Sequence, residues 1–107
     1  WKNVLHGGIQ ATLMDEIASW VVFVKLGTGG VTYKLSTKYR RPVRIDKGRL
    51  CLRAALVEVR KSIAEITVRL YDGTDQLCSE GTLEYFVLPE DKAKEEMHYP
   101  GREAFFR

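Results

Sequence analysis

Two adjacent carboxylic acids lie inside an apolar segment near the start of the sequence. Asp15 and Glu16 interrupt the run from Ile9 to Leu26, which is otherwise almost wholly hydrophobic. A carboxylate in such surroundings can act as a general base or as a nucleophile toward an electrophilic carbon. If the segment is a helix, its polar residues share one narrow stripe, because they are three, four and seven positions apart. These residues are Thr12, Asp15, Glu16 and Ser19.

Two glycines, Gly7 and Gly8, stand directly before this segment and follow His6. The first backbone N–H groups of a helix have no partner within it, and glycine allows another molecule to approach them closely. Aided by the helix dipole, these N–H groups can bind an oxygen that develops negative charge. Asp15 lies roughly 10–12 Å further along the helix than Gly7, so one copy of the chain cannot place both at one reacting carbon. A second copy could supply the missing half.

The residue pattern predicts one helix followed by four strands. Helix-forming residues predict a helix over residues 8–26, ended by Gly27. After Gly29 and Gly30 the hydrophobic period changes to two, which is typical of strands. We expect strands over residues 31–40, 49–60, 63–71 and 76–88. The turns between them are short, so the sheet should be antiparallel.

The first predicted strand alternates between apolar and polar residues. The positions expected on its buried face are Val31, Tyr33, Leu35, Thr37 and Tyr39, and Thr32 falls on the wet face. The helix itself is apolar on nearly all sides and needs cover on more than one side. We therefore expect an α+β fold in which a curved antiparallel sheet wraps a long central helix and a partner subunit completes the burial.

The helix-and-sheet order, with its opening motif, resembles the hotdog fold of acyl-CoA thioesterases. His6-Gly7-Gly8, six further residues and then Asp15 resemble the signature of the phenylacetate-pathway (PaaI-like) branch. The segments "YRRPVRIDKG" (39–48) and "LCSEGTLEYFV" (77–87) resemble a turn and the last strand of that branch. The resemblance covers residues 5–88, and we expect residues 1–88 to form the domain and residues 89–107 a charged extension.

This resemblance implies hydrolysis of acyl- or aryl-CoA thioesters in a homodimer or homotetramer, with no cofactor. Asp15 would be the general base or nucleophile and Gly7 the oxyanion donor of the facing chain. Thr32, seventeen residues after Asp15, corresponds to a Ser or Thr that positions the attacking water. Further candidates for contact with the substrate are His6, Gly8, Gln10, Glu16 and Ser19, and, for the CoA phosphates, Arg40 and Arg41. The family's usual Asn upstream of the motif has no match at the expected spacing, and Asn3 lies closer to His6.

Composition excludes several other classes of function. The 107 residues carry a net charge of only +3, and no basic stripe is interleaved with aromatics, so nucleic acid is not the expected partner. No apolar run is long enough to span a membrane. The two histidines, His6 and His98, have no metal-ligand spacing with other residues. Cys51 and Cys78 are expected to be buried, reduced thiols of a cytoplasmic protein.

Two alternatives keep the same fold. A hotdog hydratase or dehydratase would need a catalytic His paired with an acid in a different motif, and here His6 is followed at once by two glycines. A non-catalytic module that binds or senses acyl-CoA would retain the ligand without releasing thiol. The absent upstream Asn favours this second alternative.

Overall fold

The computed structural model describes residues 4–46 and 48–88. It contains one helix, α1 (Gly7–Leu26), and four strands, β1 (Gly30–Tyr39), β2 (Cys51–Arg60), β3 (Ile63–Tyr71) and β4 (Leu77–Val87). The α+β class and the order of the elements are as predicted. The charged extension predicted for residues 89–107 lies outside the described residues.

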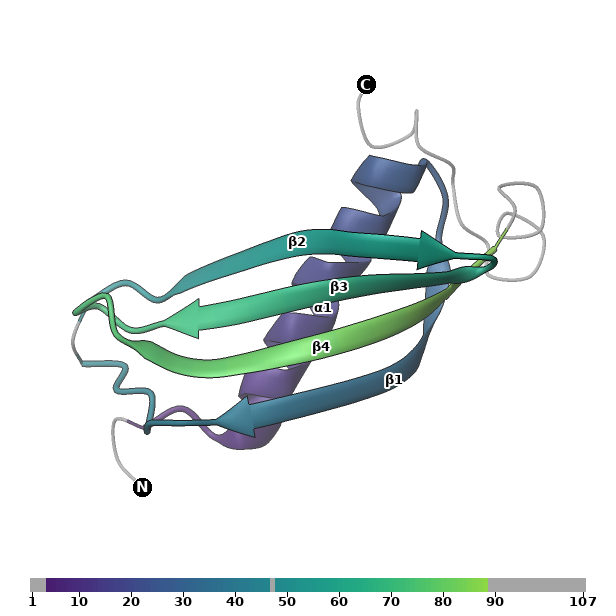
Figure 1. The fold of residues 1–107 in the computed structure, drawn as a ribbon. Coiled ribbons are helices and arrows are strands. Elements are labelled where there is room, and N and C mark those ends of the chain that lie inside the picture. The colour runs from purple at the N-terminus through teal and green to yellow at the C-terminus, as the bar shows by residue number, and fades with distance from the viewer. Residues whose placement is uncertain (1–3, 47, 89–107) are drawn as a thin grey trace.

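The strands form one antiparallel sheet in the order β1-β4-β3-β2, with β1 and β2 at its two edges. The sheet is curved, and α1 crosses one face of it and contacts every strand (Figure 1). The helix begins near the end of β1 and passes behind β4 and β3 toward β2 (Figure 1). The long helix is thus partly wrapped by the sheet.

The core lies between α1 and the inner face of the sheet. From the helix it takes side chains about one turn apart, including Met14, Ala18 and Val22, as expected for the buried stripe of a helix. From β3 and β4 it takes every second residue, because alternate strand side chains point to the same face. These are Ala64, Ile66, Val68 and Leu70, with Leu83 and Tyr85.

The helix ends where the sequence predicts. Gly27 adopts a left-handed conformation with φ 73°, and its N–H donates to the carbonyl of Phe23. Glycine is the residue that adopts this conformation without a steric penalty, so it closes the last turn. The opposite face of α1 is partly exposed in the described structure. Ile9, Trp20 and Val24 are 52%, 46% and 43% exposed, as expected if another subunit is needed to complete the burial.

The inner face predicted for β1 is correct for Leu35, Thr37 and Tyr39, which pair with the buried residues Leu83, Gly81 and Ser79, but wrong for Val31 and Tyr33. Val31 and Tyr33 are exposed, and Tyr39 is half-exposed as well, because β1 is an edge strand of the described sheet. A β-bulge between Thr32 and Lys34 also changes the phase of the strand. As a result Thr32 pairs with Tyr85 and turns to the helix side, whereas simple alternation placed it on the wet face.

The expectation of two buried cysteines is correct for Cys78 but wrong for Cys51. Cys51 is exposed, because it begins the edge strand β2 on its outer face. Both cysteines are free thiols.

Candidate active site

The helix entrance is built by His6, which is the N-cap of α1. Its Nδ1 accepts a hydrogen bond of 2.9 Å from the N–H of Gly8, which satisfies one of the unpaired donors of the first turn. The N–H of Gly7 makes no such bond within residues 4–46 and 48–88. Of the two glycines, Gly7 is therefore the one with a backbone donor available to a ligand, while Gly8 is engaged by His6.

Tyr39, at the end of β1, packs directly against Gly7. Its hydroxyl donates to the carbonyl of Gly7 at 2.9 Å. A Cβ atom at position 7 would lie only 3.3 Å from the Tyr39 ring, so the glycine gives the aromatic ring room to lie against the backbone. Sequence reasoning did not assign Tyr39 to the site. The pairing of a glycine with a ring from a distant strand leaves no local signal in the sequence.

A pocket of about 330 Å³ opens beside Gly7. It brings together four of the predicted site residues, although they come from the helix and from the segment after β1. Its lining residues are Gly7, Gln10, Tyr39, Arg40, Arg41 and Pro42. Gln10 is 4% exposed and its amide nitrogen donates to the carbonyl of Leu5, but its Oε1 is buried without a partner in the described chain. A buried acceptor of this kind ordinarily has a donor, which a ligand or a water could supply.

The two arginines of this pocket differ in how firmly they are held. Arg40 makes a two-pronged pair with Glu80, with both nitrogen–oxygen distances 3.2 Å, and this pair raises the pKa of the Arg40 guanidinium. Arg41 instead donates to the neutral side-chain oxygen of Gln76 at 3.2 Å. Arg41 is therefore the better placed of the two to neutralise an anionic ligand, since no carboxylate compensates its charge in the described residues.

The acid at the centre of the predicted site, Asp15, is half-buried on the sheet side of α1. The hydroxyl of Thr32 donates to Asp15 Oδ1 at 2.7 Å. Because the bulge turns Thr32 toward the helix, the structure brings together two of the three predicted catalytic residues. Gly7 is not with them. It lies at the other end of β1, beside Tyr39, as the helix geometry predicts.

Tyr85 of β4 is a third member of the Asp15 cluster, and the sequence reasoning missed it. Its hydroxyl donates to the backbone carbonyl of Asp15 at 2.7 Å and makes a short contact with Asp15 Oδ1. Burial raises the pKa of the Tyr85 phenol, and the hydrogen bond to Asp15 raises it further. A signal was available, because Tyr85 is on the inner face of its strand, where a phenol needs a hydrogen-bond partner.

The remaining polar residues of the helix stripe do not join this cluster. Glu16 is exposed and its side chain makes no hydrogen bond or ion pair in the described part of the chain. The hydroxyl of Ser19 donates to the carbonyl of Glu16 at 2.7 Å, and that of Thr12 donates to the carbonyl of Gly8 at 2.9 Å. Both hydroxyls thus bond to their own helix, which leaves Asp15 as the acid that faces the sheet.

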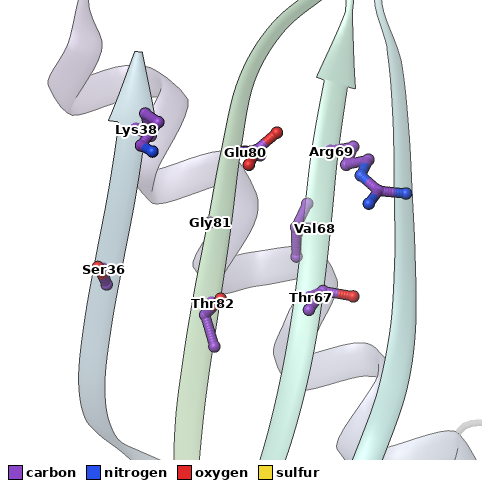
Figure 2. Close-up of a pocket in the computed structure, with 8 residues that line it drawn as sticks. All are labelled: Ser36, Lys38, Thr67, Val68, Arg69, Glu80, Gly81 and Thr82. Atoms are coloured by element: carbon purple, nitrogen blue, oxygen red, sulfur yellow. The ribbon is translucent and has the colours of Figure 1, made fainter. Parts of the chain in front are cut away.

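A separate shallow pocket of about 180 Å³ lies on the outer face of the sheet (Figure 2). Lys38, Glu80 and Arg69 form a cross-strand row there, with the helix behind the strands (Figure 2). Charges of both signs alternate in this row, which is the arrangement of a solvated sheet face. The pocket lies on the opposite side of the sheet from Asp15 and is not part of the site.

No group of three His, Cys, Asp or Glu side chains in residues 4–46 and 48–88 is arranged to hold a metal ion. Among the same residues, no helix has the length and hydrophobicity needed to cross a membrane.

Comparison with known proteins supports this description. The family model of the thioesterase superfamily matches residues 2–79. A protein of Thermoplasma acidophilum described as a candidate esterase is 29% identical over 86 residues, which are 79% of this chain and 64% of the relative. The chain thus spans less than two thirds of that relative's length.

Two solved structures show the same arrangement of helix and sheet. A thioesterase from Haemophilus influenzae has a TM-score of 0.74 and 26% identity, over 81% of this chain and 61% of its own. A Bacillus halodurans protein, crystallised with CoA, has a TM-score of 0.69 and 29% identity, over 79% of this chain and 56% of its own. The predicted hotdog fold is therefore confirmed, and the chain belongs to the thioesterase superfamily.

Proposed function

We propose that the protein hydrolyses acyl- or aryl-CoA thioesters to the free acid and CoA, as a cytoplasmic enzyme of the PaaI-like type. The observation that carries this proposal is the Asp15 carboxylate. It is half-buried on an apolar helix and is held through Oδ1 by Thr32 and Tyr85. Within residues 4–46 and 48–88 its other oxygen, Oδ2, accepts no hydrogen bond, so it is available to the reacting groups.

In the proposed reaction, Asp15 Oδ2 takes a proton from water as the water oxygen attacks the thioester carbonyl carbon. The N–H of Gly7 donates to the oxyanion of the tetrahedral intermediate. The intermediate then collapses, the carbon–sulfur bond breaks, and the proton held by Asp15 passes to the leaving sulfur. Direct attack by the carboxylate, followed by hydrolysis of the resulting anhydride, gives the same products with the same residues.

The site is proposed to form between two copies of the chain. Gly7 and Asp15 lie about 12 Å apart along the helix and touch opposite ends of β1, through Tyr39 and Thr32. The free edge of β1 can pair with the same edge of a second copy. In an antiparallel pair related by a two-fold axis, the Tyr39 end of one strand meets the Thr32 end of the other. This brings Gly7 of one protomer to the Asp15 of its partner.

A tetramer built from two such dimers would also bury the exposed face of the sheet or the exposed face of the helix.

The bound CoA is proposed to extend from the Asp15–Gly7 cleft to the pocket of Arg41, where the guanidinium would bind its phosphates. The CoA in the Bacillus halodurans relative supports this choice of ligand. His6, Gly8 and Gln10 would shape the entrance between these two regions, and Ser19 and Glu16 would lie at its far side.

The proposal is tested by measuring release of CoA thiol from a panel of acyl- and aryl-CoA esters. Asp15→Asn is expected to lower kcat by about 10²–10⁴-fold, since it removes the base and keeps the size of the side chain. Glu16→Gln removes the neighbouring carboxylate and should cost far less. A parent protein that binds CoA esters and cleaves none of them would instead identify the non-catalytic binding module.

A further inference from the structure

Tyr85 is one of the most buried large side chains in the described chain, with 2% of its surface exposed. It lies on the inner face of β4 near the end of the strand, opposite Ala64 on β3 and Thr32 on β1. Hydrophobic packing explains the ring. It does not explain the hydroxyl, because a phenylalanine would fill the same space without placing a polar group in the core.

The hydroxyl of Tyr85 is aimed at a single residue of the helix. It donates to the backbone carbonyl of Asp15 at 2.7 Å and also contacts the carboxylate oxygen Oδ1 of the same residue. One phenol therefore fixes both the backbone and the side chain of Asp15. Since the carboxylate is attached to the helix by rotatable bonds, a donor from the sheet restricts its orientation.

Thr32 completes this arrangement from the other side. Its hydroxyl donates to Oδ1 as well, at 2.7 Å, so two donors from two strands converge on one oxygen. The phenol has one proton, which it shares between the Asp15 carbonyl and Oδ1, while the Thr32 hydroxyl donates to Oδ1. Oδ2 is left as the oxygen that can accept a proton. The pairing of Thr32 with Tyr85 across the β1–β4 ladder keeps the two donors together.

We propose that Tyr85 is a positioning residue for the thioesterase reaction, which holds Asp15 so that Oδ2 faces the substrate. This inference rests on the proposed function, because the reaction gives Oδ2 its role. Tyr85 acts through Asp15 and touches no substrate atom.

Other charged groups near Asp15 are few, so the effect of Tyr85 can be isolated. On α1 the adjacent titratable residue is Glu16, which is exposed. The inner faces of β2 and β3 carry apolar residues, including Leu56 and Ile66. The nearest charged residues of β1 and β4, Lys34 and Glu84, pair with each other on the outer face of the sheet.

The test compares the pH dependence of kcat/KM in the parent protein and in Tyr85→Phe. Loss of a hydrogen bond to the charged carboxylate should move the acidic limb upward by about one pH unit, since Asp15 must be deprotonated to act. KM for the CoA ester should change little. Tyr33→Phe is the matched control, because Tyr33 is 62% exposed on β1, lies against the Phe86 ring and makes no hydrogen bond to Asp15. An acidic limb that stays in place in Tyr85→Phe would overturn the proposal, even if the rate or the stability falls.

A second measurement does not depend on catalysis. The carboxyl-carbon chemical shift of Asp15 can be measured by NMR in both proteins at one pH and assigned with Asp15→Asn. It is expected to differ between Tyr85→Phe and the parent, because the phenol no longer contacts Oδ1, and equal shifts would overturn the inference. Should Tyr85→Phe fail to fold, biosynthetic replacement of tyrosine by 3-fluorotyrosine strengthens the phenol as a donor and should move the same resonance. If the parent cleaves no CoA ester, the proposed function fails, while this measurement still decides whether Tyr85 holds the Asp15 carboxylate.

Discussion

Gly7 combines two features that make its role testable by a single substitution. It is the first residue of α1, and His6 before it has ψ 142°, the extended conformation that also precedes proline. Proline is well tolerated at the first position of a helix, and it has no N–H. Gly7→Pro should therefore remove the proposed oxyanion donor while the helix keeps its start.

We expect Gly7→Pro to lower kcat by about 10²–10³-fold, the usual effect of losing one oxyanion donor. Gly7→Ala is the matched control, because it adds a Cβ against the same Tyr39 ring, 3.3 Å away, and keeps the N–H. Steady-state kinetics on the best CoA ester of the panel measure the difference. Equal losses in the two variants would mean that crowding at Tyr39, and not the donor, explains the role of the glycine.

At the scale of elements, the turn between β3 and β4 is held by one carboxylate. Asp72 Oδ1 accepts hydrogen bonds from the Thr74 hydroxyl at 2.6 Å, the Thr74 N–H at 2.8 Å and the Gln76 N–H at 3.1 Å. These bonds, that of the Thr74 side chain first, lower the pKa of Asp72 from 3.8 to about 2. The turn sets the register of β4 and so the position of Tyr85.

The stability contributed by Asp72 should depend on pH with a definite sign. The folded pKa of about 2 lies below the unfolded value of 3.8, so the contribution is complete above pH 3.8 and lost as the pH falls through 2. In Asp72→Asn the urea midpoint should be lower than in the parent at pH 6, and the two should converge near pH 2. The urea midpoint of Asp75→Asn, a change of an exposed acid in the same turn, should depend on pH as that of the parent does. If the full difference in urea midpoint between Asp72→Asn and the parent persists at pH 2, the charge of Asp72 does not stabilise the turn.

The elements could be predicted from sequence because each is encoded locally. The apolar helix ends at a glycine. Apolar and polar residues alternate along the strands, and turns rich in Gly and Asp separate them. The side of the sheet on which Thr32 lies could not be predicted, because a bulge adds one residue to β1 opposite β4. Such a bulge depends on how the two strands pair, and the sequence of one strand does not reveal it. Tyr85 was missed for a similar reason. Its partner is seventy residues away, and alternation predicts that a side chain points inward without predicting what it meets.

At the scale of the whole molecule, the described residues include an edge strand and an exposed apolar helix face. β1 lies at the edge of the described sheet, next to β4, and the outer side of α1 exposes Ile9, Trp20 and Val24. Apolar residues gathered on one helix face favour an interface. The proposed two-fold pairing at β1 makes each active site depend on two chains, Gly7 from one and Asp15 from the other.

This dependence predicts that two inactive variants restore each other. A heterodimer of Gly7→Pro and Asp15→Asn chains has one site with both defects and one site with neither, because a two-fold axis exchanges the contributions. If the subunits mix randomly, half of the dimers are heterodimers, and the mixture should reach about a quarter of the parent's specific activity. The measurement is thiol release after the two variants are unfolded together and refolded, with each variant refolded alone as the control. Activity no higher than that of the separate variants would contradict the shared site. Gly7 of one chain and Asp15 of the other would then not act on the same substrate.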